Sequence, residues 1–168
     1  MFDKFGEFDS AEELNRAALA QREEGDKEAL KLLAAENGID VEDAEDFING
    51  WADELVSPVM AALGKLDVEC VEYKIEGVLK GWVEEIRINC MSDEAFARAV
   101  RRKGKDLAGF MAQAIEQGCE RRITVDDRIV KKAPKVKAVM GQHPLTMGVL
   151  NKAETKQLIK DYYMGGSK

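Results

Sequence analysis

The chain has 168 residues, of which 45% are hydrophobic and 34% are charged. This composition supplies enough apolar material for a folded core and too much for a disordered chain. No apolar run approaches the roughly 20 residues of a membrane-spanning helix, and the first residues lack the apolar stretch of a signal peptide. We therefore expect a cytoplasmic protein with no membrane partner.

Cysteine and histidine are too few and too scattered for a metal centre. Cys70, Cys90 and Cys119 lie far apart in the chain, no CxxC pair is present, and His143 is the only histidine. A structural zinc site needs about four closely spaced ligands of these types. We therefore expect three reduced thiols, no bound metal and no cofactor.

The net charge of −7 is distributed unevenly along the chain. Residues 1–94 contain 25 acidic and 9 basic side chains, a balance of −16, whereas residues 95–168 contain 7 acidic and 16 basic side chains, a balance of +9. Such polarity bears on partners and on electrostatic steering rather than on the fold.

The acidic N-terminal part is predicted to form three short helices. Ser10 with Glu13 forms the pattern of a capping box, in which each side chain satisfies a free backbone donor of the first turn. Asparagine and glycine pairs are typical of helix ends. The three helices are expected to begin after Ser10, Asp26 and Asp40 and to end at Gly25, Gly38 and Gly50, with Val41, Ala44, Phe47 and Ile48 turned inward in the third.

Two further helices are predicted between residues 51 and 90. The first begins at Trp51, is interrupted at Ser57-Pro58 and ends at Gly64. The second shows apolar residues at spacings of three and four, which indicate one buried stripe. Its glycines at 77 and 81 favour close packing of another helix. The stripe consists of Val68, Val71, Ile75, Val78, Leu79, Trp82 and Ile86.

A long helix is predicted to begin after the capping sequence Ser92-Asp93-Glu94. Phe96, Val100, Leu107, Met111 and Ile115 are expected on its buried side. At 100° per residue, four basic residues of this helix fall on the face opposite Phe96 and are expected in solvent. Gly104 and Gly109 either bend this helix or split it in two. The basic residues are Arg98, Arg101, Arg102 and Lys105.

The C-terminal part is predicted to contain a short helix from residue 124 or 125 to about residue 132. Residues 133–145 are expected to be irregular, with a short strand at 136–140 as one arrangement, and a final helix contains Leu158, Ile159 and Tyr162. The fold class is therefore all-α, with about seven to eight helices. A small acidic helical lobe at residues 1–64 packs on a basic helical region at residues 65–168, or the two form one compact domain.

No catalytic motif is present, so we do not expect an enzyme. His143 stands beside Pro144 in a turn-like segment, and nothing near it marks an activated serine or cysteine. A calcium loop beginning at Asp40 would need glycine and glutamate where Glu45 and Trp51 stand. Gly104-Lys105 is followed by aspartate and lacks the earlier glycine of a phosphate-binding loop.

Two charged surfaces remain as candidate binding sites. The acidic one either docks on a basic groove, imitating a phosphate backbone, or is only a solvated face. The basic one either attracts nucleic acid or pairs with the acidic half, within one molecule or between two. The acidic candidates are Asp40, Glu42, Asp43, Glu45, Asp46, Asp53 and Glu54. The basic candidates are Arg98, Arg101, Arg102, Lys105, Arg121, Arg122, Lys131 and Lys132.

The residues from Asp93 to Gly109 resemble a block in small proteins of mobile elements and prophages of gut Firmicutes, a family called PcfK-like after conjugative plasmids. Phe5-Gly6-Glu7 with Ser10 to Glu13, and Asp161 to Gly165, are similar to it as well. Some such proteins resemble anti-CRISPR proteins. The stretch from Arg121 to Leu145 departs from the family pattern, being more basic and poorer in glycine.

The resemblance implies a stoichiometric inhibitor that binds the type II CRISPR RNA-guided nuclease in the bacterial host and blocks DNA binding or cleavage. The acidic lobe would contact the nuclease, and the basic face would contact guide RNA or target DNA. The alternative is an accessory DNA-binding or regulatory protein of a conjugative element or prophage, whose basic cluster contacts phosphates directly. A homodimer is compatible with both.

Overall fold

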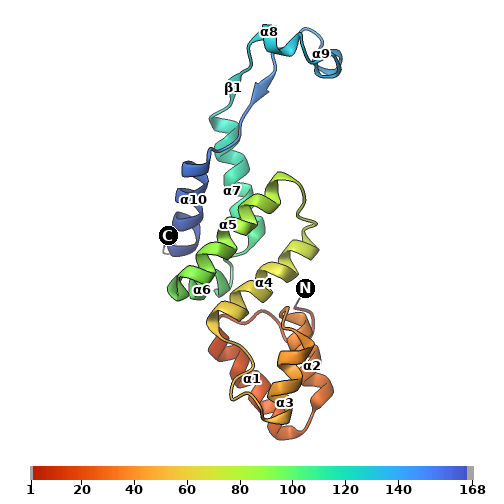
Figure 1. Cartoon of the computed structure of the whole chain (residues 1–168), viewed down its shortest axis with the longest axis vertical. Coiled ribbons are helices and arrows are strands. Elements are labelled where there is room, and N and C mark those ends of the chain that lie inside the picture. Colours follow the sequence, from red (N-terminus) through yellow and green to blue (C-terminus); the bar gives the residue numbers. More distant parts are fainter. Residues whose placement is uncertain (1, 166–168) are drawn as a thin grey trace.

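The computed structural model describes residues 2–165, which form ten helices and one two-stranded sheet. The predicted all-α class is confirmed, although the helices outnumber the expected seven to eight. The molecule is elongated, with α1–α3 at one end and α8 and α9 at the other (Figure 1). In chain order the elements are α1 (Ala11–Glu24), α2 (Lys27–Glu36), α3 (Val41–Asn49), α4 (Pro58–Glu72), α5 (Val78–Ser92), α6 (Glu94–Arg101), α7 (Leu107–Glu120), β1 (Ile123–Thr124), α8 (Asp127–Val130), α9 (Pro134–Met140), β2 (Thr146–Met147) and α10 (Lys152–Met164).

Helices α1–α3, here called the N-terminal lobe, pack around an apolar cluster that includes Leu14, Leu33 and Phe47. The helix starts and ends follow the expected capping residues. The side chain of Glu13 accepts from the backbone N–H of Asp9 (2.8 Å) rather than from the N-cap residue. The prediction that Val41 points inward is wrong, because its side chain is 62% exposed at the first turn of α3.

Helix α4 differs from its predicted bounds at both ends. Residues 51–57 are not helical, and α4 begins at Pro58, with the Ser57 side chain as its cap, and continues through Gly64. The role of Gly64 is close packing rather than helix termination. A Cβ at this position would lie 2.9 Å from the carbonyl oxygen of Gly38, so only glycine lets α4 approach the end of α2 this closely. Position 64, the expected lobe boundary, thus lies inside a continuous helix.

The single helix predicted to carry the stripe from Val68 to Ile86 is wrong. The chain turns at residues 73–77, where Lys74 and Gly77 have positive φ angles of 51° and 58°, and α5 runs back along α4 (Figure 1). Val71 and Val78 are therefore 80% and 69% exposed. No helix packs closely on Gly81, because a Cβ there would meet nothing within 4 Å.

The helix predicted from residue 92 is split in two, one of the two expected arrangements. Gly104, with φ of 72°, lies in the turn between α6 and α7. The expected inward residues Phe96 and Leu107 are buried, but Ile115 is 53% exposed. The predicted stripe therefore continues across the turn to Leu107 and Met111 of α7, which are both buried, and fails only at Ile115, further along α7.

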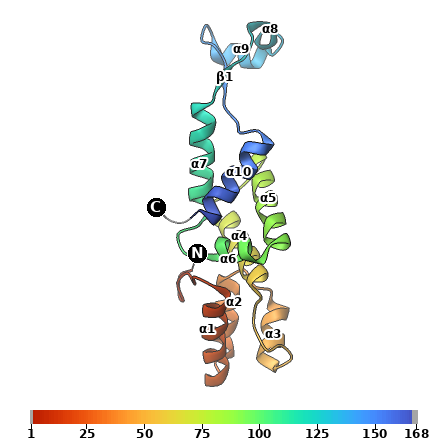
Figure 2. The same ribbon diagram turned by 90° about the vertical axis from the view of Figure 1, so that its left-hand side faces the viewer.

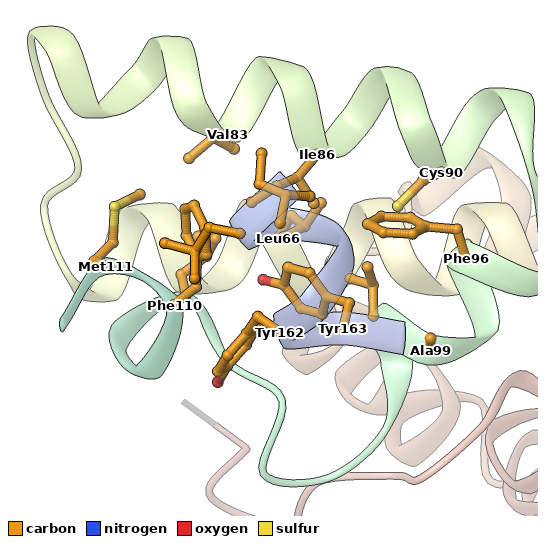
Figure 3. Packing of buried hydrophobic residues seen from close by; sticks show 14 of the residues in the cluster. Leu66, Val83, Ile86, Cys90, Phe96, Ala99, Phe110, Met111, Tyr162 and Tyr163 are labelled. Carbon is orange, nitrogen blue, oxygen red and sulfur yellow. The ribbon is translucent and has the colours of Figure 1, made fainter. Parts of the chain in front are cut away.

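The main core lies among α4–α7 and α10 and is rich in aromatic rings (Figure 3). The final helix, α10, confirms its prediction and brings Tyr162 and Tyr163 into this core. The ring of Tyr163 lies 5.6 Å from that of Phe96 and 6.3 Å from that of Phe110, measured between centroids. Such offset and edge-on contacts add about 0.5–1.5 kcal/mol each beyond burial.

Residues 121–149, here called the basic arm, project from the end of the helical body (Figures 1 and 2). Strands β1 and β2 pair antiparallel at its base, with Thr124 opposite Thr146, and α8 and α9 form its tip. The strand considered at residues 136–140 is wrong, because Pro134 begins a helix there. Val130 is the only buried residue within 121–149.

A pair of glycines fixes the place where the arm leaves the body. A Cβ on Gly118 of α7 would lie 2.8 Å from the carbonyl oxygen of Gly148, so the two backbones touch where side chains would keep them apart. No helix within residues 2–165 is long and apolar enough to cross a membrane.

Candidate functional site

The acidic face, defined by the seven predicted acidic residues, lies on α3 and the segment after it. Asp43 is half-buried and the other six residues are exposed. Phe47 on the opposite side of α3 is buried, so packing of this ring turns the carboxylates outward. Glu45 pairs with Lys31 at 3.1 Å. Among the described residues the rest of the face has no ion pair, so it presents nearly uncompensated negative charge.

A groove of about 380 Å³ adjoins the acidic face, between α1 and the segment before α4. Phe47 and Val56 are among its apolar lining residues, while Asp53 and Glu54 contribute carboxylates. Trp51, which follows α3, is 79% exposed. The acidic face therefore lies beside exposed apolar surface, an arrangement in which an apolar contact would have a charged rim.

The basic residues of α6 and the following turn do not form the predicted solvated face. Arg98 pairs with Glu12 and with Glu94; its hydrogen bond to Glu12 lowers the pKa of that carboxyl to about 2. Lys105 Nζ donates to the carbonyl oxygen of Tyr162 at 2.8 Å, near the end of α10. Of the four predicted residues there, only Arg102 keeps an exposed side chain without an ion pair among the described residues.

Arg101 contradicts the prediction most clearly, since it is 1% exposed. Its Nη2 donates to Asn37 Oδ1 at 2.6 Å, and its Nη1 donates to the carbonyl oxygen of Ala61 at 3.4 Å. Burial lowers the pKa of its guanidinium to about 10. Because these partners lie in the N-terminal lobe and in α4, Arg101 holds that lobe to α6 and has no access to a nucleic acid.

A buried pair on α4, Lys65 and Glu69, was not predicted. Lys65 is fully buried and its Nζ lies 2.5 Å from Glu7 Oε1 and 3.8 Å from Glu69 Oε1. Glu69 Oε2 accepts from the backbone N–H of Leu107 at 2.8 Å, and burial raises the pKa of Glu69 to about 7. The spacing of four residues was its only sequence signal. These groups tie the N-terminal segment and the start of α7 to α4.

The other four predicted basic residues are brought together on the basic arm. This segment has seven basic and two acidic side chains, a balance of +5. Arg121 pairs with Glu154 at 2.7 Å and Lys131 pairs with Asp127 at 2.7 Å. Among the described residues, the cations of the arm that are exposed and have no ion pair are Arg122, Lys132 and Lys135.

Apolar side chains are interleaved with these cations. Ile129 and Val139, near the tip of the arm, are 63% and 85% exposed, and Ile123 and Met147 are exposed in the paired strands. A segment with one buried residue and this much exposed apolar surface lacks a core of its own. Exposed apolar surface of this kind, bordered by charged residues, is typical of contact sites.

Among residues 2–165 no group of three or more histidine, cysteine, aspartate or glutamate side chains is placed to hold a metal ion. His143 is exposed in the turn after α9. Comparison of the chain with protein-family models, with curated proteins and with solved structures found no significant match.

Proposed function

We propose that this chain acts by binding a nucleoprotein, with the basic arm on the nucleic acid and the acidic face on basic protein surface. The observation that carries this proposal is the separation of charge: the two surfaces lie at opposite ends of the elongated molecule (Figure 2). Exposed cations bind phosphate backbones through release of counterions. A partner that carries nucleic acid and a basic protein surface offers complementary charge to both ends at once.

The nucleoprotein that we propose is the RNA-guided nuclease of type II CRISPR systems, which the chain would inhibit stoichiometrically. The resemblance to anti-CRISPR proteins supports this target. Its strongest block, Asp93 to Gly109, is α6, a turn and the start of α7, where Phe96, Val100 and Leu107 are buried. The residues of this block that carry the similarity thus include core positions. The charge arrangement supports a nucleoprotein partner in general, and the choice of this nuclease rests on the resemblance.

A cleavage assay with guide-loaded nuclease tests the proposal. The protein is titrated before and after target DNA is added, and inhibition should saturate near one equivalent. Inhibition only when the protein is added before the target DNA would mean that DNA binding is blocked. Uninhibited cleavage at a large excess, with several nuclease orthologues, would refute this target.

Two sets of variants assign the surfaces. The arm variant should weaken inhibition by at least tenfold, whereas the control variant, with three exposed cations removed elsewhere, should behave like the parent protein. Equal effects of both variants would mean that net charge alone acts. The arm variant is Arg122→Ala, Lys132→Ala, Lys135→Ala, and the control variant is Lys27→Ala, Lys80→Ala, Lys160→Ala.

The second candidate function is direct DNA binding, as in an accessory protein of a conjugative element. The three exposed cations of the arm without ion pairs favour it, because they meet phosphates without first breaking a contact. Fluorescence anisotropy with duplex DNA should give an affinity that falls with salt. The arm variant should reduce the slope of log K against log salt by about two to three. A slope unchanged by the arm variant would contradict this function.

A further inference from the structure

We propose that copies of this chain associate head to tail, with the basic arm of one copy on the acidic face of the next. The two surfaces carry opposite charge, which within residues 2–165 the fold leaves mostly unpaired on the acidic face and unpaired at three of the seven cations of the arm. Of the acidic face only Glu45 has an ion-pair partner among the described residues, and the arm keeps three exposed, unpaired cations at Arg122, Lys132 and Lys135. Complementary surfaces of this kind steer association and fix its orientation.

The arm and the acidic face cannot meet within one molecule. The helical body of α4–α7 and α10 lies between them (Figures 1 and 2), and it is packed around one continuous core. Any pairing of the two surfaces is therefore between copies. Because the two surfaces differ, the contact is heterologous, and repeating it produces a ring or an open chain.

In the free protein, without a nucleoprotein partner, the apolar surface beside both charged patches favours a second copy as the occupant over nucleic acid alone. The arm exposes Ile129 and Val139 beside its cations, and the acidic face is bordered by the exposed Trp51 and Val41. A phosphate backbone would neutralise the cations and leave the apolar groups and the acidic face uncovered. A second copy covers both, with apolar contacts inside a rim of opposite charges. This contact needs neither nucleic acid nor nuclease, so it does not depend on the function proposed above.

Sedimentation velocity of the pure protein, free of nucleic acid, is the first measurement. At about 0.05 M salt the average mass should rise with protein concentration to at least twice the 18.7 kDa of one chain. At about 0.5 M salt it should return to that of one chain, because screening shortens the range of the attraction. A monomer at every concentration in low salt would refute the association.

Charge reversal on each surface identifies the contact. The arm variant has Arg122→Glu, Lys132→Glu and Lys135→Glu, and the face variant has Glu42→Lys, Asp46→Lys and Glu54→Lys. Each alone should stay monomeric in low salt: the arm variant changes the balance of the arm from +5 to −1, and the face variant changes the balance of the seven acidic positions from −7 to −1, so each loses most of the attraction. An equimolar mixture should associate again, because the unchanged arm of the face variant finds the unchanged acidic face of the arm variant. This recovery would also show that both variants are folded.

A control variant with Lys27→Glu, Lys80→Glu and Lys160→Glu changes the net charge equally and should associate like the parent protein. Loss of association in this control would mean that overall charge is responsible and would overturn the assigned surfaces. A mixture of the arm and face variants that stays monomeric, while each has the parent's helical circular dichroism, would overturn them too. Tests of nucleic-acid binding are separate, so failure of one proposal leaves the other standing.

Discussion

Replacing Arg101 by alanine separates the buried position in the structure from the solvated position that periodicity predicts. The substitution removes the donors to Asn37 Oδ1 and to the carbonyl oxygen of Ala61, both in the interior. Arg102→Ala, one residue further on, is the matched control, because the Arg102 side chain is exposed and has no ion pair among the described residues.

Three effects set the size of the loss in stability. Leaving the buried Asn37 Oδ1 without its donor costs about 1–3 kcal/mol, whereas the Ala61 carbonyl lies inside α4 and keeps its helical hydrogen bond. The space left by a large side chain costs about 2–4 kcal/mol more. Removal of a buried charge acts in the other direction. The pKa of Arg101, lowered from 12.5 to about 10, corresponds to relief of about 3 kcal/mol. The net expectation is destabilisation by about 2 kcal/mol, against under about 0.5 kcal/mol for Arg102→Ala.

Urea unfolding followed by circular dichroism measures both values, and anisotropy with duplex DNA measures any direct role. We expect Arg101→Ala to unfold at lower urea and, where still folded, to bind DNA like the parent protein. Equal stability of the two variants, together with weaker DNA binding by Arg101→Ala, would refute the burial of this side chain.

Three further predictions concern the polar core, the base of the arm and the cysteines. Because the pKa of Glu69 is raised from 4.5 to about 7, its contribution to stability is fully present below about pH 4.5 and is lost as pH rises through 7. Between these values the parent should lose roughly 3 kcal/mol relative to Glu69→Gln in urea unfolding, and parallel pH profiles would contradict this. Gly118→Ala should destabilise the protein by about 1–3 kcal/mol, because the added methyl group clashes with the arm. Gly81→Ala, in open space within α5, should stabilise it by up to about 1 kcal/mol. Thermal melts in which Gly118→Ala is not the less stable variant would disprove the contact between Gly118 and Gly148. The exposed Cys119 should react with a thiol reagent in the folded protein. Cys90 is buried, and burial raises its pKa to about 12, so it should react only after unfolding. Mass spectrometry counts the modified cysteines in each state.

The candidate site was predictable in composition and only in part in location. The acidic face stays where the sequence places it, because its carboxylates are close together in the chain and α3 is anchored by Phe47. The basic set divides, because α6 packs against α4 and the N-terminal lobe and thereby removes Arg101 from solvent. Sequence periodicity identifies the side of a helix but not what a second helix places against that side.

Local signals in the sequence determined the helical class and most helix starts, since a cap joins residues two or three apart. They also determined the separation of charge, which is a property of composition. The tertiary structure alone decided that α4 continues through Gly64, because close contact with Gly38 gives that glycine its role. It alone decided that the chain reverses at residues 73–77. In the sequence the apolar spacing runs through these residues without a break, so the pattern gives no sign of the turn. The projection of the basic arm likewise depends on a contact between residues far apart in the chain, Gly118 and Gly148, which no local pattern encodes.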